Sequence, residues 1–490
     1  MSTESSSAVP PAKVISIAPA ASVASEATEP PDEVEISLYE ARKKIYPRSV
    51  SGLFARWRWV LVFLTQIVFY GLPWLAWNNR QAVLFALESR RFYLFGLVLY
   101  PQDFIYLTGL LVISALSLFL FTAVAGRLWC GYACPQTVYT EIFLWIEKKV
   151  EGDRSARIRL DEQSLSLAKF GRKSLKHLLW GALALWTGFT FVGYFTPIRE
   201  LASAFAAWDL GPWQTFWIFF YGFATYGFAG WMREQVCKYM CPYARFQSAM
   251  FDHDTMIVTY DTARGEPRGA RGKKVDYQAR GLGACVDCSL CVQVCPTGID
   301  IRKGLQYECI GCGACADVCD EVMDKMGYAR GLVKYSTQNG MTHGWSRAQM
   351  VRRALRPRVL VYLGILMAIV VALGVSLAMR TPLRVDVIRD RGALARMVEQ
   401  GRIENVFRLQ LMNATEATQQ LAISVEGLDG IQSATDRGVA VAPTEVKPLV
   451  MRVQVPPGVA SGSHPVRFQI RSESDPAIHV EEKSVFIVPR

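Results

Sequence analysis

Many of the hydrophobic residues of this chain fall into long runs before residue 380, whereas after it they alternate with polar residues. An α-helix needs roughly 20 apolar residues to cross a bilayer. Five runs come close to that length without a Lys, Asp or Glu in their interior: 58–77, 104–126, 178–197, 213–231 and 359–379. Soluble helices rarely stay apolar on every face for so long, and tryptophans near several ends fit an interfacial belt. The pattern predicts a bundle of five transmembrane helices.

Two stretches in the N-terminal region do not fit this pattern. Residues 1–36 are rich in Ser, Ala, Pro, Thr and Glu. Such a segment buries too little surface to offset the entropy of ordering, and it lacks the basic start and apolar core of a secretory signal. We expect it to be disordered. Residues 81–100 are apolar but are interrupted by Glu88, Arg90 and Arg91, so we expect an interfacial or hairpin excursion there.

The distribution of Lys and Arg between the runs predicts their orientation. The chain has 490 residues, 51% of them hydrophobic, and a net charge of +11. Segments 78–103 and 198–212 hold three and one Lys or Arg, against ten in 127–177 and nineteen in 232–358. Because basic loops stay in the cytoplasm, we expect the N-terminus and both basic segments to be cytoplasmic and the C-terminal region to be extracytoplasmic. The charge then reflects topology, and nucleic acid is not an expected partner.

Eight of the twelve cysteines form two copies of the spacing C-x2-C-x2-C-x3-C. The copies are Cys285, Cys288, Cys291 and Cys295, and Cys309, Cys312, Cys315 and Cys319. In bacterial two-cluster ferredoxins the fourth cysteine of each run ligates the other 4Fe–4S cluster. This assigns Cys285, Cys288, Cys291 and Cys319 to cluster I, and Cys309, Cys312, Cys315 and Cys295 to cluster II. Two four-cysteine zinc sites and a disulfide framework are the weaker alternatives. We predict a cytoplasmic ferredoxin-like domain over 256–345 with two 4Fe–4S clusters.

The other four cysteines form two copies of C-x-Y-x-C-P, each just after a predicted span. They are Cys130 and Cys134 in the first copy, and Cys237 and Cys241 in the second. The matched motifs, each preceded by an arginine, indicate an internal duplication. The i, i+4 spacing predicts both thiols of a copy on one helical face, with the following proline disrupting the helix. Four thiolates at the membrane boundary suit Cu(I), zinc or an iron–sulfur centre, or a dithiol–disulfide cycle. Buried structural cysteines are the alternative.

After residue 380 the short alternating runs are typical of half-buried strands. The clearest are 404–412, 418–425, 448–455, 465–471 and 483–488. Roughly seven short strands in about 100 residues favour an immunoglobulin-like β-sandwich, and we expect a short helix at 389–402. The predicted order is a disordered 1–36, a membrane domain 37–255, the ferredoxin-like domain, a basic linker and fifth span 346–380, and the outer sandwich 381–490.

Together these features resemble one family, the cytochrome c oxidase accessory proteins of the FixG, CcoG or RdxA type. The resemblance rests on Lys44-Ile-Tyr-Pro-Arg48, the two C-x-Y-x-C-P motifs, the ferredoxin pair and the outer sandwich. It implies a multi-pass bacterial inner-membrane protein with a periplasmic C-terminal domain, which assists assembly of a cbb-type cytochrome c oxidase by reducing Cu(II) to Cu(I). Cys130, Cys134, Cys237 and Cys241 match the family's intramembrane pairs and would carry copper reduction or transient copper binding. The ferredoxin-type cysteines would deliver electrons. A copper chaperone or copper-transporting ATPase and the oxidase subunits would be partners.

Three hypotheses stay open from the sequence. In the first, the chain is an oxidoreductase, a cupric reductase whose thiolates favour Cu(I) over Cu(II). In the second, it conducts electrons between the quinone pool and a periplasmic or membrane partner without copper chemistry, because it is also similar to the membrane polyferredoxins of periplasmic nitrate and nitrous oxide reduction. In the third, it is a non-redox scaffold for oxidase assembly. The electron donor and the oligomeric state, a homo-oligomer included, are not specified.

Overall fold

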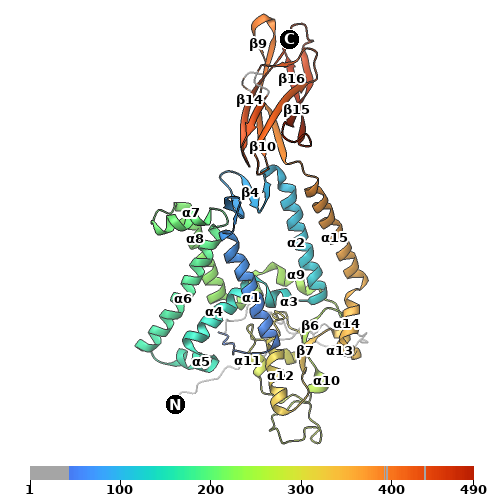
Figure 1. Ribbon diagram of the computed structural model, residues 1–490. Helices are drawn as coiled ribbons and strands as arrows, with labels where there is room; N and C mark the ends of the chain where they lie inside the picture. Colours follow the sequence, from blue (N-terminus) through green and yellow to red (C-terminus); the bar gives the residue numbers. More distant parts are fainter. Residues whose placement is uncertain (1–43, 391, 393–394, 435–437, 490) are drawn as a thin grey trace, which may run out of the picture. The chain divides into compact units, whose positions relative to one another are not determined.

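The computed structural model describes residues 44–489 apart from 391, 393, 394 and 435–437, and the chain divides into two compact units (Figure 1). The first unit comprises the residues up to Val62 together with Phe121–Leu179 and Phe228–Ala354. The second comprises Phe63–Leu120, Trp180–Gly227 and Leu355–Arg490. The segment 1–36, which we expect to be disordered, lies outside the described residues.

Each of the five apolar runs of the sequence is helical over most of its length. They correspond to α1 (Leu53–Gly71), α2 (Phe104–Ala125), α6 (Leu167–Val192), α8 (Pro212–Thr225) and α15 (Pro357–Ala378). Among the described residues, three helical segments are long and apolar enough to cross a membrane: Leu53–Trp74, Pro101–Ala125 and Pro357–Ala378. Proline begins the last of these at the first helical position, where its missing N–H would have no partner in any case.

The first, third and fourth runs differ from the expected spans in their bounds. α1 begins at Leu53, before the expected residue 58, and a 3-10 turn over Leu72–Trp74 follows it, so that Ala76–Trp77 lie in a strand instead of the expected span. α6 begins at Leu167, within a basic stretch, and it ends at Val192 rather than at residue 197. α8 ends at Thr225, where the chain continues as a π-helix over Tyr226–Met232. The third and fourth helices are therefore present, but their length and composition do not by themselves mark them as spans.

Short helices and a small sheet support the cysteine motifs of the first unit. The sheet pairs β6 (Ile257–Tyr260) with β7 (Val333–Ser336) antiparallel. Its buried side chains pack on α12 (Ala314–Met326) through Ala316 and Met323. The other helices are α3 (Leu128–Tyr132), α4 (Pro135–Glu151), α5 (Arg154–Glu162), α9 (Pro242–Met250), α10 (Thr262–Gly265), α11 (Leu290–Gln293), α13 (Gln338–His343) and α14 (Arg347–Ala354).

The interrupted apolar stretch 81–100 forms a hairpin structure, as predicted. β3 (Val83–Ala86), β4 (Arg91–Leu94) and β5 (Leu97–Leu99) make a three-stranded antiparallel meander. Before it, β1 (Ala76–Trp77) pairs with β2 (Arg80–Gln81). The two residues between them, Asn78 and Asn79, have φ angles of 46° and 61°, which is the backbone of a two-residue hairpin turn that asparagine tolerates.

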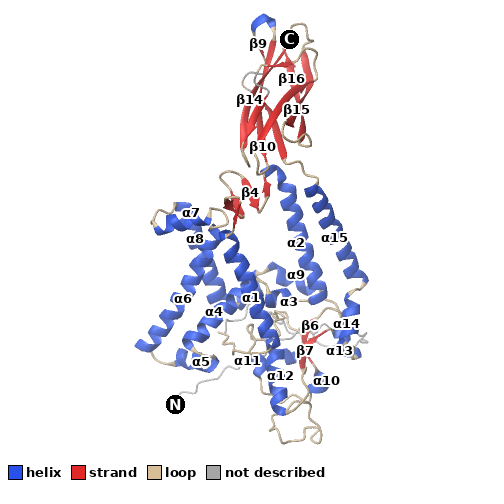
Figure 2. Cartoon of the chain, in the orientation of Figure 1, coloured by secondary structure: helices blue, strands red, loops and turns tan. Residues whose placement is uncertain are grey.

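The C-terminal region is a β-sandwich, which confirms the predicted architecture (Figure 2). One sheet has the order β12-β14-β10-β8, with β9 also paired to β10, and the other has the order β13-β11-β15-β16. The sheets face each other across a core that includes Phe407, Phe468 and Phe486, all fully buried. The strands are β8 (Leu383–Arg389), β9 (Arg396–Met397), β10 (Ile403–Asn413), β11 (Gln419–Glu426), β12 (Gln432–Ser433), β13 (Gly438–Val441), β14 (Val446–Val455), β15 (Gly462–Ser472) and β16 (His479–Val488).

The short helix expected at 389–402 is wrong. The described residues of this stretch hold the end of β8, the strand β9 and one 3-10 turn at Glu399–Gly401. Gln400 and Gly401 have φ angles of 62° and 72°, which no α-helix accommodates. β9 pairs with β10, with Met397 opposite Ile403, so a local turn and strand pairing replace the helix.

Within the second unit, the meander is joined to the sandwich by a buried charge cluster. The Asp103 carboxylate, just before α2, lies 2.6 Å from Arg380 and 2.6 Å from Arg384, and its side chain is 0% exposed. The Tyr100 hydroxyl donates to the carbonyl of Asn413 at 2.8 Å. Met412 packs with Tyr100 and the meander side chains in one apolar cluster. The sandwich is thereby attached to the start of α2 and the end of α15.

Candidate functional site

Two hollows in the first unit are lined by cysteines of both ferredoxin motifs, five at the first hollow and four at the second. Cys309, Cys312, Cys315 and Cys295 line a hollow of about 340 Å³, named here the Cys309 site. Cys285, Cys288, Cys291 and Cys319 line a second hollow of about 380 Å³, the Cys285 site. Cys291 borders both, so the two hollows are neighbours. The structure thus brings together the two sets that the motif spacing assigns to clusters II and I.

The Cys309 site has the surroundings that a 4Fe–4S cluster requires. Apolar side chains such as Ile299 and Ile310 line it. Burial raises the pKa of the Cys309 thiol to about 12, and a hydrogen bond from the Gly311 N–H partly opposes this rise. Burial likewise raises the pKa of Cys312, which receives a hydrogen bond from the Ala314 N–H. Cysteine sulfurs with backbone donors in an apolar hollow fit an iron–sulfur cluster, and ligation by these residues stays a prediction.

The cysteines that the structure describes are not grouped at the distances of a single bound ion. A tetrahedral zinc site needs its cysteine sulfurs about 2.3 Å from one ion. Within the part of the chain that the structure describes, no three His, Cys, Asp or Glu side chains are grouped so that they could hold a single ion. This holds for the two ferredoxin sets and equally for Cys130, Cys134, Cys237 and Cys241, so it does not distinguish zinc from another metal.

The i, i+4 spacing predicts that both thiols of each remaining pair lie on one helical face, and this prediction is wrong. Cys130 lies in α3, whereas Cys134 precedes α4 with an extended backbone, at φ −61° and ψ 128°. Cys237 lies in a π-helix over Val236–Met240, and Cys241 precedes α9 with φ −77° and ψ 110°. Each motif proline begins the next helix, and the residue before a proline is driven out of the helical region. The residue that carries the second thiol of each pair therefore connects two helices in an extended conformation.

The thiols of both motifs nevertheless lie within electrostatic range of one another. Burial, with smaller contributions from the neighbouring Cys134 and Cys241, raises the pKa of Cys130 to about 11, although the hydrogen bond with Gln247 opposes the rise. Burial raises the pKa of Cys237 to about 12, with additional contributions from Cys134, Cys130 and Cys241. The duplicated motifs therefore face a common region, which we call the thiol site.

The thiol site is in direct contact with the Cys309 site through Gly131. A Cβ atom on Gly131 would lie 2.8 Å from the Cα of Cys312 and 2.9 Å from the carbonyl oxygens of Ile310 and Gly311. No side chain fits there, so the backbone beside Cys130 packs directly on the cluster-type loop. Cys130 itself packs in the apolar cluster that holds Cys312.

The two arginines that precede the motifs connect the two copies of the duplication. Arg127, before the first motif, donates to the carbonyl of Ala244 in α9, which follows the second motif, at 3.0 Å. Arg233, before the second motif, lies 3.1 Å from Glu147 in α4, which follows the first motif. Arg127 also donates to the carbonyl of Cys309 at 3.3 Å. Each arginine thus binds the helix that follows the other motif.

Gln247 is a candidate site residue that sequence reasoning missed. Its side-chain amide Nε2 lies 3.4 Å from the Sγ of Cys130, and its Oε1 lies 3.6 Å from the same atom. The residue is fully buried. Its position in α9 after Cys241-Pro242 was the available signal, but a lone glutamine carries no chemistry of its own.

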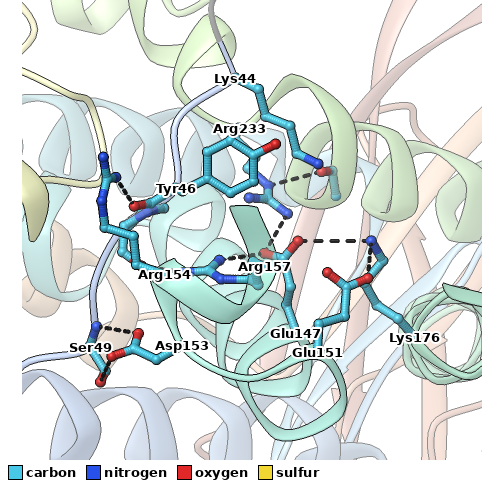
Figure 3. Close-up of polar contacts among 12 residues, drawn as sticks. Lys44, Tyr46, Ser49, Glu147, Glu151, Asp153, Arg154, Arg157, Lys176 and Arg233 are labelled. Atoms are coloured by element: carbon cyan, nitrogen blue, oxygen red, sulfur yellow. Dashed lines mark hydrogen bonds and ion pairs between the residues drawn. The ribbon is translucent and has the colours of Figure 1, made fainter. Parts of the chain in front are cut away.

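A buried ionic network surrounds Glu147 and Glu151 of α4 (Figure 3). Glu147 accepts a hydrogen bond from Arg157 at 2.9 Å, and Lys176 lies 2.9 Å from Glu151. Burial opposes the ionisation of Glu147, yet Arg233, Arg157 and Lys176 together lower its pKa. The network holds α4, α5 and α6 together beside the thiol site.

The network also holds the segment Lys44-Ile-Tyr-Pro-Arg48. The Tyr46 hydroxyl donates to Asp161 at 2.7 Å. Ser49 donates its N–H and its hydroxyl to Asp153, both at 3.0 Å (Figure 3). Farther along, the N–H groups of Phe54 and Ala55 at the start of α1 donate to Asp317 of α12. This segment is therefore anchored on both the helical and the ferredoxin-like parts of the first unit.

Comparisons with protein families agree with this layout. A family described as a 4Fe-4S dicluster domain matches residues 232–338, and one described as a 4Fe-4S binding domain matches residues 107–151. The latter range contains Cys130 and Cys134. A third family, described as the IG-like fold at the C-terminal of FixG, matches residues 373–489. The fold and the cysteine sites define an iron–sulfur electron-transfer protein with apolar helices compatible with a membrane.

Relatives that match over most of the chain identify its family more specifically than the single domains do. The chain is 39% identical over 461 residues to the nitrogen fixation protein FixG of Rhizobium meliloti, covering 86% of this chain and 88% of the relative. It is 39% identical over 403 residues to protein RdxA of Cereibacter sphaeroides, covering 81% and 85%. The chain belongs to the FixG family. A crystal structure of a FixG-related protein from Vibrio parahaemolyticus is 28% identical with a TM-score of 0.21, covering 22% of this chain and 97% of that one.

Proposed function

We propose that this chain is a membrane-bound cupric reductase that serves the assembly of a cbb-type cytochrome c oxidase. The observation that carries the proposal is the packing of Gly131, next to Cys130, on the backbone of Cys312. This contact gives an electron at the Cys309 site a short route to the thiol site. The resemblance of the motif set to oxidase accessory proteins supports the assembly role.

The residues divide the chemistry between three places. A 4Fe–4S cluster held by each cysteine set would supply a one-electron carrier. Cys130, Cys134, Cys237 and Cys241 bind the substrate Cu(II), which gains one electron and becomes Cu(I) while the reduced donor loses one. Soft thiolates favour Cu(I) and so raise the potential of the bound couple. Gln247 holds the Cys130 side chain in place. Cu(I) then passes to a copper chaperone or copper-transporting ATPase and to the oxidase.

The proposal includes a five-span topology in the bacterial inner membrane. α6 and the helix formed by α8 and its π-helical continuation are the two further spans. Aromatic side chains exposed on α8, among them Phe219, Phe220 and Phe223, support this because exposed apolar surface of that extent is unusual in water. The basic loops favour a cytoplasmic ferredoxin-like domain and a periplasmic sandwich.

The test is copper reduction by the anaerobically purified chain, followed with a chelator specific for Cu(I). C130S/C134S and C237S/C241S are compared with the variant that carries all four substitutions. Iron–sulfur absorbance reports whether the clusters are retained. We expect the four-serine variant to keep its clusters and to lose copper reduction. Copper reduction at the wild-type rate would show that the thiol site is wrongly assigned.

A quinone-linked electron conduit is the second candidate, and a separate hollow favours it. This hollow is lined by Arg58, Trp59 and Trp145, and by Val294 and Pro296 on either side of Cys295. Trp59 and Trp145 form an edge-to-face pair with ring centroids 6.3 Å apart. A quinone ring fits such a mixed aromatic and cationic lining. Rapid cluster oxidation by a soluble quinone analogue, in a chain that binds no copper, would favour this candidate over the first.

A further inference from the structure

The segment between α10 and the first ferredoxin motif carries an unusual density of positive charge. Residues 264–280 hold six Lys or Arg and two Asp or Glu. Lys273, Lys274 and Arg280 are exposed, and they form no ion pair with any residue that the structure describes. Retention of a loop in the cytoplasm requires only that the loop carry positive charge. It does not explain why the charge is placed beside a cysteine site.

This basic segment is fixed against the Cys285 site. The Gly269 N–H donates to the carbonyl of Cys285 at 3.3 Å. Arg271 donates to the carbonyls of Cys285 at 3.2 Å and Gly283 at 2.7 Å. The Arg271 guanidinium also lies over the ring of Tyr277, 5.0 Å from its centroid. The charges that follow Arg271 are therefore presented by an ordered loop.

The two cysteine hollows differ in their access to solvent. All twelve cysteines are described, and only Cys288, at the Cys285 site, is exposed. Arg302 lines the same hollow and lies 2.5 Å from Asp287, while Arg268 lies 3.9 Å from Asp287. Each site also has one buried cysteine, Cys285 and Cys312, but only the Cys309 site is covered in addition by the backbone at Gly131. Electrons from outside the chain can therefore approach the Cys285 site directly, and the Cys309 site lies on the route to copper.

We propose that residues 264–280, with Arg302, form a docking surface for an acidic one-electron carrier protein that delivers electrons at the Cys285 site. The inference rests on the proposed electron-transfer function. Complementary charge steers a carrier to its acceptor and raises the association rate. In each encounter the carrier is oxidised by one electron and the Cys285 site is reduced by one, and no bond is made or broken. An anionic lipid surface is the competing occupant of the same charges.

The experiment measures binding of an acidic flavodoxin to the full-length chain in detergent as a function of ionic strength. Variant K273Q/K274Q/R280Q is compared with R347Q/R352Q/R353Q, which removes the same charge from exposed residues of α14. We expect at least about tenfold weaker binding and slower cluster reduction by reduced flavodoxin for the first variant alone, because rim charges act chiefly on association. Equal loss in both variants, or no loss in either, would overturn the proposal.

Two further arms separate the alternatives. Vesicles with anionic lipid are offered to both variants; if the first variant loses vesicle binding but keeps flavodoxin binding, the surface is a lipid site and the proposal fails. Copper reduction driven by dithionite, a small reductant that needs no docking surface, should be unchanged in the first variant. Absence of that reduction in the wild-type chain would overturn the proposed function, whereas flavodoxin binding would still report on the docking surface.

Discussion

Gly131 and Cys312 are in backbone contact: a Cβ on Gly131 would lie 2.8 Å from the Cα of Cys312. This contact joins the first C-x-Y-x-C-P motif to the second ferredoxin motif, which are far apart along the chain. It is reinforced by Arg127, which reaches the carbonyl of Cys309, and by the Tyr335 hydroxyl, which donates to the carbonyl of Gly311 at 2.7 Å and lies 3.1 Å from the Tyr132 hydroxyl. The predictions below follow from this junction and from the ionic networks around it.

Replacing Gly131 with valine should move the thiol site away from the Cys309 site. The added side chain meets backbone that cannot rotate away, and overpacking of this kind costs about 1–3 kcal/mol. We expect copper reduction to fall while both clusters remain visible by absorbance and electron paramagnetic resonance. G181A is the control, because a Cβ on Gly181 of α6 meets nothing within 4 Å. A G131V chain with wild-type copper reduction would show that this contact is not the electron route.

Arg127→Lys should loosen the junction without removing the charge. The planar Arg127 guanidinium donates hydrogen bonds to the carbonyls of Ala244 and Cys309 at the same time, and a lysine ammonium cannot reproduce this geometry. Each buried carbonyl left without a donor costs about 1–3 kcal/mol, so the thermal unfolding temperature of the anaerobic protein should drop. R347K, on the exposed face of α14, should leave it unchanged. Equal unfolding temperatures for R127K and the wild type would refute this role of Arg127.

Glu147→Gln should destabilise the first unit and alter its response to acid. Removing one partner of a buried ion pair costs about 3–5 kcal/mol, because Arg157 and Arg233 keep uncompensated charge. The folded-state pKa of Glu147 lies below its ordinary value of 4.5, so its contribution is fully present above that value and is lost as pH falls through the folded value. Denaturation followed from pH 7 to well below pH 4.5, where the wild-type chain loses this contribution, should show a smaller acid-dependent loss in E147Q. An identical pH profile would contradict this assignment.

Asp103→Asn should weaken the attachment of the sandwich in the second unit. The buried Arg380 would keep its charge without a carboxylate partner, and the half-buried Arg384 would lose the same partner. We expect faster limited proteolysis near the end of α15 and a lower unfolding temperature. D390N is the matched control, since Asp390 pairs with Arg408 at 3.9 Å and the Arg408 side chain is 66% exposed, where such pairs contribute little. Proteolysis that is equally fast in both variants would argue against the role of Asp103.

Much of this architecture could be predicted from the sequence because its signals are local or periodic. The spacing of the ferredoxin cysteines predicted that three cysteines of one motif and one of the other share each hollow, although Cys291 borders both. The alternating runs predicted the sandwich strands. The one-face arrangement of Cys130 and Cys134 failed because Pro135 forces the residue before it into an extended backbone. The helix expected at 389–402 failed because β9 finds its partner in β10.

The junction itself could not be predicted, because nothing local encodes it. Gly131 and Cys312 belong to separate motifs, and a glycine between two cysteines looks like an ordinary small residue. The exchange of partners between Arg127 and Arg233 likewise depends on how the two motif copies pack. The duplication shows that the arginines are matched, but only the fold shows that each binds the helix following the other motif.

The most direct measurement is a single-turnover experiment on the full chain with its clusters reduced and the excess reductant removed. One equivalent of Cu(II) is added, and cluster absorbance and Cu(I)-chelator absorbance are followed together. The wild-type chain should form one Cu(I) for each electron lost from the clusters. C130S/C134S/C237S/C241S should keep its clusters reduced and form no Cu(I). Equal cluster oxidation and Cu(I) formation in both proteins would contradict the proposal that electrons reach copper at these four cysteines.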